Sequence, residues 1–138
     1  MKKFIKILLV LFIPLIFLTG CKQEKDSKNP FIAFSDEPVN QQTVPKYHFP
    51  SGHRIYYAIV CPKGFNAQVI RVQIFKKDEK TDILGYSYHS TKDYRLSNDK
   101  YYLDYIVIHN PGHYIMQVFE ITDLQKPKVL GDFWVVDR

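Results

Sequence analysis

The feature that most constrains the fold is a series of short segments, rich in β-branched and aromatic residues, that recurs after residue 30. In residues 68–76 ("QVIRVQIFK"), the apolar Ile70, Val72 and Ile74 alternate with polar residues, which is the period-two pattern of a half-buried strand. Seven segments of this kind are predicted to be strands: 31–35, 53–61, 68–76, 83–89, 101–109, 113–122 and 128–137. Polar or Pro/Gly-containing breaks separate them at regular intervals, and no helical periodicity lies between them. This spacing predicts an all-β sandwich or barrel.

One turn refines this prediction. Residues 110–114 ("NPGHY") lie between two strongly apolar segments and resemble the tyrosine corner of immunoglobulin-like sandwiches, with Tyr114 as the matching residue. Two antibody hallmarks are missing, because Met116 occupies the position of the second disulfide cysteine and the only tryptophan, Trp134, lies in the last segment. The resemblance implies an antiparallel immunoglobulin- or fibronectin-type sandwich of about seven strands.

The N-terminus has the pattern of an export signal. Lys2, Lys3 and Lys6 make the start of the chain positively charged, and residues 4–18 are an almost wholly apolar run of about fifteen residues, shorter than the roughly twenty that span a bilayer as a helix. The run ends in "LTGC" (residues 18–21), which resembles the lipobox of bacterial lipoproteins. An uncleaved signal anchor is the alternative.

The lipobox resemblance implies that residues 1–20 are a signal peptide and that Cys21 is the lipidated first residue of the mature protein. Its thiol would carry two acyl chains and its amino group a third, such as palmitate, and two chains give a stable membrane anchor where one does not. Lys22, rather than Asp, follows the cysteine. This implies that the protein is carried to the outer membrane if the cell has an outer membrane, and that it otherwise lies on the outer face of the plasma membrane.

Residues 21–30 combine the lipidated cysteine with a polar stretch that should act as a flexible tether, and residues 31–138 are the size of one domain. Removal of the three signal lysines lowers the count of Lys and Arg from 19 to 16, against 14 Asp and Glu. The mature chain is therefore nearly neutral. It also has no basic run of the kind that follows phosphates, so nucleic-acid binding is not expected.

The sequence carries no recognisable catalytic motif, and we expect the protein not to be an enzyme. With Cys21 lipidated, Cys61 has no partner for an intrachain disulfide. No histidine is near it in sequence, so we expect a small buried hydrophobic residue rather than a nucleophile. No dissociable cofactor is expected; the one added group is the lipid on Cys21.

Four histidines flank two loops that a sandwich would place at the same end: His48 and His53 around one, His109 and His113 around the other. Gathered imidazoles can bind Zn or Cu. A metal-binding envelope protein is therefore one alternative function, although no carboxylate or thiol at ligand spacing supports these histidines.

Aromatic residues suggest a candidate site more strongly than the histidines do. Tyr86 and Tyr88 point to the same side of their predicted strand, and Phe119 and Trp134 are placed on outward positions of theirs. Exposed aromatic patches bind proteins, or sugars that stack on the rings. The sequence thus predicts a non-catalytic binding, adhesion or envelope-assembly module with an unknown protein or glycan partner, and a carbohydrate-binding module is the first alternative.

Overall fold

The computed structural model describes residues 28–77 and 85–137 and is all-β in those ranges. Within them no helix occurs that is long and apolar enough to pass through a bilayer. The eight strands are β1 (Phe31–Ser35), β2 (His48–Pro50), β3 (Arg54–Val60), β4 (Val69–Lys77), β5 (Tyr86–Arg95), β6 (Tyr101–Val107), β7 (Gly112–Glu120) and β8 (Val129–Val136).

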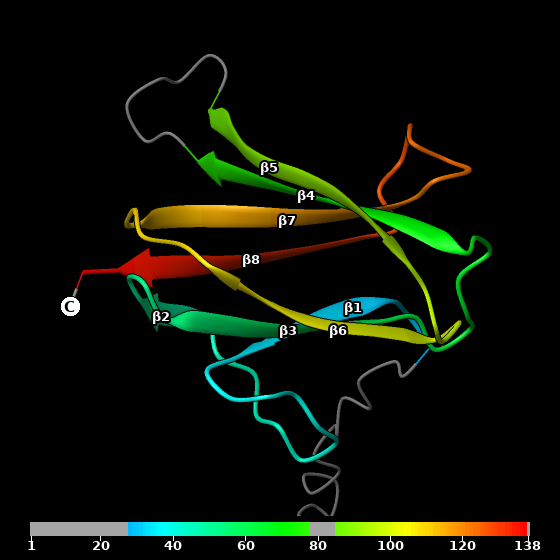
Figure 1. Ribbon diagram of the computed structural model, residues 1–138, viewed down its shortest axis with the longest axis horizontal. Coiled ribbons are helices and arrows are strands. Elements are labelled where there is room, and N and C mark those ends of the chain that lie inside the picture. The colour runs from blue at the N-terminus through cyan, green and yellow to red at the C-terminus, as the bar shows by residue number, and fades with distance from the viewer. Residues whose placement is uncertain (1–27, 78–84, 138) are drawn as a thin grey trace, which may run out of the picture.

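The strands form two sheets packed face to face, so the predicted sandwich is confirmed (Figure 1). One sheet has the order β1-β3-β6 and the other the order β2-β8-β7-β4-β5. Pairing is antiparallel throughout, except that β2 runs parallel to β8. The chain enters β1 at one end of the sandwich and leaves β8 at the other (Figure 1).

Two elements differ from the sequence prediction. β2 was not expected, because three residues within a proline-containing stretch carry no alternating pattern. β5 extends to Arg95 rather than ending at His89, since its second half is polar and exposed and therefore lacks the hydrophobic alternation that marks a strand. The predicted start of this strand, residues 83–84, lies outside the described residues.

The core lies between the sheets and is rich in aromatic rings. Phe133 of β8 packs against Phe34 of the opposite sheet, with ring centroids 4.8 Å apart. Phe49 and Tyr114 contact the same ring from the neighbouring strands, at 6.2 and 5.7 Å. All four side chains are almost completely buried. Such tilted, edge-on and stacked aromatic contacts stabilise a core beyond the area they bury, which suits a domain whose Cys61 is a free thiol.

A bulge between β4 and β5 determines which side chains of β5 face outward. Ile74 pairs with Ser90, whereas the next residue, Phe75, pairs with Tyr88, so His89 is the extra residue. The His89 side chain is exposed but lies near buried Tyr114, with ring centroids 5.5 Å apart and the ring planes at 76°. The bulge therefore leaves Tyr88 on the outer face of the sheet.

The turn before β3 contacts the turn before β7. The Gly52 amide donates to the Ile108 carbonyl at 2.9 Å, and the Ser51 hydroxyl donates to the His109 carbonyl. Tyr114 closes the second turn, since its hydroxyl donates to the Asn110 carbonyl at 2.7 Å. The two loops lie at the same end, as predicted, and Tyr114 makes the backbone hydrogen bond that the corner resemblance implies.

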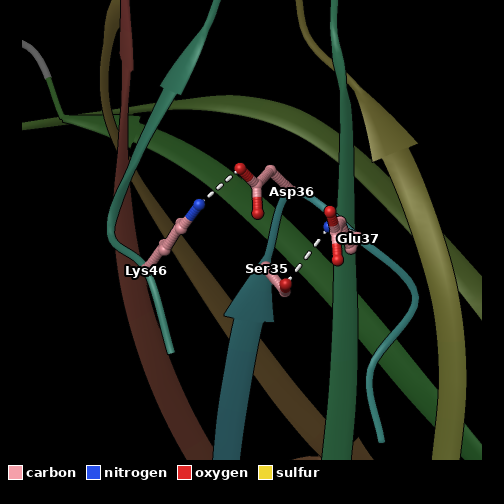
Figure 2. Close-up of polar contacts among 4 residues, drawn as sticks. All are labelled: Ser35, Asp36, Glu37 and Lys46. Atoms are coloured by element: carbon pink, nitrogen blue, oxygen red, sulfur yellow. Dashed lines mark hydrogen bonds and ion pairs between the residues drawn. The ribbon is translucent and has the colours of Figure 1, made fainter. Parts of the chain in front are cut away.

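The segment between β1 and β2 carries the chain from one sheet to the other. Its two ends are joined by an ion pair between the Lys46 ammonium and the Asp36 carboxylate at 2.5 Å, and the Glu37 amide donates to the Ser35 hydroxyl (Figure 2). Both charged groups are about half exposed, so the pair orients the segment more than it stabilises the fold.

Candidate functional site

The outer face of the five-stranded sheet carries the most conspicuous group of exposed apolar side chains with a hollow between them. We call this surface the aromatic face; it comprises Phe75, Tyr86, Tyr88, Ile115, Leu130 and Trp134. Tyr86, Tyr88 and Leu130 are 54%, 66% and 56% exposed. Two of the four predicted patch residues, Tyr86 and Tyr88, are therefore co-exposed on one surface.

The centre of the aromatic face is a shallow hollow of about 290 Å³. Its walls are Phe75, Tyr86, Ile115, Leu130 and a single polar residue, Gln117. Tyr88 stands beside it, with its ring edge-on to Phe75 at a centroid distance of 6.3 Å. A mostly apolar hollow with one amide and exposed tyrosines at its side suits the side chain of a protein partner.

Trp134 faces outward as predicted, but both faces of its ring are covered. The His113 ring stacks on it at a centroid distance of 4.0 Å and an interplanar angle of 2°, and the His48 ring lies at 5.2 Å and 13°. These contacts follow from the register, in which His48 and His113 flank Trp134 on the two neighbouring strands. The His113 Nε2 also contacts the Asp132 carboxylate at 2.8 Å. Trp134 thus offers only a ring edge to a partner.

The assignment of Phe119 to the exposed patch is wrong. Phe119 points to the outer face, but its side chain is only 8% exposed. It lies near the end of β7, where the chain turns back: the Asp123 amide donates to the Glu120 carbonyl, and the Lys128 amide donates to the Val118 carbonyl. We attribute the burial of Phe119 to this return turn, which alternation along a single strand does not predict.

The four histidines do not form a metal site. The described part of the chain contains no group of three or more His, Cys, Asp or Glu side chains arranged to hold a metal ion. His48 and His113 are engaged with Trp134, while His53 and His109 are exposed in their turns. Although the two loops meet, the His48 and His113 rings each stack on Trp134 rather than on each other. We therefore do not base a metal-binding proposal on these histidines.

Cys61 is buried, and its thiol donates to the Gly64 carbonyl at 3.1 Å. Burial raises the pKa of the Cys61 thiol, with a smaller contribution from Glu120. A buried thiol with a raised pKa is a poor nucleophile, in agreement with the structural role predicted for it. Cys21, the predicted lipidation site, lies outside the described residues.

Sequence reasoning missed two further surfaces. The outer face of the three-stranded sheet presents an apolar row along β6, made of Tyr101, Leu103, Tyr105 and Val107, each between 41% and 50% exposed. A cleft of about 420 Å³ also opens between β5 and β6. The alternation of β6 could have indicated the first surface, whereas the cleft depends on which strands lie at the sheet edges.

Comparison with known proteins does not assign the chain to a family. No protein-family model matches the chain, and no curated protein is significantly similar to it. The fold and the surfaces described above are therefore the basis for a functional proposal.

Proposed function

We propose that this chain is a bacterial lipoprotein, anchored in the cell envelope through Cys21, that serves as a non-catalytic binding module. The lipobox pattern at residues 18–21 and the following polar tether support the anchoring. We place the lipid in the outer membrane if the cell has one, and in the outer leaflet of the plasma membrane otherwise. Attachment by two or three acyl chains would hold the sandwich stably at the membrane surface.

We further propose that the sandwich is of the immunoglobulin-like kind. The strand order β8-β7-β4-β5 matches the G-F-C sheet extended by one strand, and β1-β3-β6 matches strands A, B and E. The bond from Tyr114 to the Asn110 carbonyl supports the same assignment, because it joins the start of the F-equivalent strand to the turn before it.

The observation that carries the binding role is the hollow of the aromatic face, flanked by exposed Tyr86, Tyr88 and Leu130. A protein partner fits it best. Tyrosine and aliphatic side chains around a mostly apolar hollow are typical of the core of a protein interface. The surrounding Trp134, His113 and Asp132 would form a more polar rim.

A carbohydrate partner is the second candidate, because Tyr86 and Tyr88 are both exposed and can stack on sugars. The structure favours the carbohydrate hypothesis less than the sequence alone does. Sugar stacking needs a free ring face, and both faces of Trp134 are occupied by His48 and His113.

Anchoring is tested by replacing Cys21 with Ala in cells supplied with an alkyne-labelled fatty acid. The wild-type chain should incorporate the label and fractionate with membranes. The Cys21→Ala variant should lose the label and remain unprocessed, whereas Cys61→Ala, which removes the other thiol, should be labelled like the wild type. Equal labelling of the Cys21→Ala and wild-type chains would refute the lipoprotein assignment.

The binding face is tested with a photo-crosslinking amino acid at Gln117 in living cells. We expect one discrete protein adduct, which disappears when Tyr86 and Tyr88 are both changed to Ser. The matched control is the pair Tyr101→Ser and Leu103→Ser on the opposite sheet, which should leave the adduct intact.

Three outcomes would contradict this assignment. Loss of the adduct only with the control pair would move the binding role to the opposite sheet. Absence of any protein adduct would exclude a protein partner at this face. A glycan adduct would replace the protein partner with the carbohydrate alternative.

A further inference from the structure

The cleft between β5 and β6 lies at the open side of the sandwich. Each of these strands is the edge of its sheet, and each pairs with only one other described strand. The cleft therefore opens between the two layers rather than on either outer face. Its volume of about 420 Å³ falls within the range of small-molecule sites.

The interior of the cleft is apolar. Val72 and Ile74 of β4 contribute from one sheet, and Ile106 of β6 and the Tyr57 ring of β3 from the other. These side chains belong to the inward-facing positions of their strands, so the cleft is continuous with the domain core. An apolar body of a ligand would bury itself there as a core side chain does.

Tyr57 provides an unpaired polar group at the inner wall of this cleft. Its side chain is 1% exposed, and its hydroxyl finds no hydrogen-bond partner among the described residues. Burial raises the pKa of Tyr57, and the nearby Tyr94, Asp104 and Tyr102 raise it further. The Tyr94 hydroxyl approaches that of Tyr57 without reaching the geometry of a hydrogen bond. The group is therefore a neutral donor. A buried hydroxyl left unpaired costs free energy that a bound acceptor recovers.

The rim of the cleft carries one charge of each sign, Lys92 and Asp104, and of the two only the carboxylate is hydrogen-bonded within the described ranges. The Asp104 carboxylate accepts from the Tyr102 hydroxyl at 3.0 Å and from the Tyr105 amide at 2.8 Å. The Lys92 ammonium lies 5.0 Å from the centre of the Tyr94 ring and makes no salt bridge within the described ranges. Its nearest carboxylate in sequence, Asp93, is held by Arg71 on the outer face. The cleft thus presents an available positive charge at its mouth.

We propose that this cleft binds a small organic anion with an apolar body. The anionic group contacts Lys92 at the mouth, the body packs between the sheets, and an oxygen at the far end accepts a hydrogen bond from the Tyr57 hydroxyl. Less than 1 Å² of that hydroxyl oxygen meets water, so binding requires neighbouring side chains, Tyr94 among them, to move aside for the ligand oxygen. This site is separate from the aromatic face and does not depend on anchoring or on the protein partner proposed above.

The test is equilibrium dialysis with the purified full-length protein in nanodiscs, with empty nanodiscs as the blank. Three probes separate the contacts. 4-Hydroxyphenylacetate has both the anion and the far oxygen, phenylacetate lacks the oxygen, and 2-(4-hydroxyphenyl)ethanol lacks the charge. We expect saturable binding, tightest for 4-hydroxyphenylacetate.

Two variants assign the contacts. Tyr57→Phe should weaken 4-hydroxyphenylacetate by about three- to tenfold, the effect of one hydrogen bond, and leave phenylacetate within about twofold. Phenylacetate thereby reports that the variant is folded. Lys92→Gln should weaken both anions and spare the uncharged probe, whereas Lys63→Gln, an exposed lysine outside the cleft, should change none of them.

The proposal is overturned if none of the probes binds saturably, which would leave the cleft to water alone. It is equally overturned if Tyr57→Phe weakens phenylacetate as much as 4-hydroxyphenylacetate, or if Lys63→Gln and Lys92→Gln have the same effect. None of these results bears on the crosslinking at Gln117, so the two proposals fail separately.

Discussion

At the residue scale, two tyrosines show how little burial alone says about a side chain. Tyr57 and Tyr114 are each 1% exposed and both face the core. The Tyr114 hydroxyl donates to a turn carbonyl, whereas the Tyr57 hydroxyl has no partner in the described part of the chain. The first group stabilises a turn, and the second is a polar atom whose burial is uncompensated unless something occupies the cleft.

The same replacement at these two positions should therefore change stability in opposite directions. Tyr114→Phe removes a hydrogen bond and should lower the free energy of unfolding by about 1 kcal/mol. Tyr57→Phe removes an unpaired hydroxyl and should raise it by up to about 1 kcal/mol. Urea titrations of the two variants and the wild type measure both values. A loss at Tyr57 equal to that at Tyr114 would show that Tyr57 is satisfied in solution.

Element-scale packing explains which strands the sequence predicts and which it does not. β4 buries alternate side chains, and β3 and β7 are largely buried runs of β-branched and aromatic residues, so their sequences indicated them. The second half of β5 is mostly exposed and β2 has only three residues, so neither carries a hydrophobic alternation that could indicate a strand. Residues of the candidate site follow the same division: Tyr86 and Tyr88 were found by alternation within one strand. The stacking of Trp134, the burial of Phe119 and the cleft depend on neighbouring strands or turns that only the topology reveals.

Gly131 of β8 lies against β1 across the core. A Cβ atom placed there would lie 3.0 Å from Phe34 Cε2, 3.1 Å from Ile32 Cβ and 3.2 Å from Ile32 Cδ1. Gly131→Ala should therefore destabilise the domain by about 1–3 kcal/mol through overpacking. The cost should fall when Ile32→Val removes the Cδ1 methyl group, so that the double variant loses less than the sum of the single losses. Additive losses in urea unfolding would place the strain elsewhere.

At the scale of the whole molecule, the stability of the fold should depend on pH, because tyrosine hydroxyls and a cysteine thiol are buried in their protonated form. Burial is the first cause that raises the pKa of Tyr57, Tyr102, Tyr114 and Cys61. The unfolded chain loses these protons near their ordinary pKa values, about 8.5 for cysteine and about 10 for tyrosine. The folded chain still holds them at that pH. Because the unfolded state then binds fewer protons, stability should fall as the pH rises.

The measurement is the urea midpoint between pH 7 and pH 11. We expect a nearly constant midpoint up to about pH 8.5 and a progressive decrease above it. The decrease should be smaller in Tyr57→Phe, which lacks one of the four groups. A midpoint that rises with pH across this range would contradict the assignment of these protons to the folded state.

The chain enters the first strand of the sandwich and leaves the last strand at opposite ends of the domain, and this has a mechanical consequence. Phe31 pairs with Val60 at one end of the sandwich, while Val136 pairs with Pro50 at the other (Figure 1). Tension between the two ends pulls the parallel strands β2 and β8 along their length in opposite directions. Their hydrogen bonds run across the strands and must break together rather than one by one. Pulling a single molecule from residues 31 and 137 should therefore need more force than pulling from the paired residues 31 and 60, which peels β1 from β3. A sandwich held by lipid at one end would in this way resist a partner that pulls on the other.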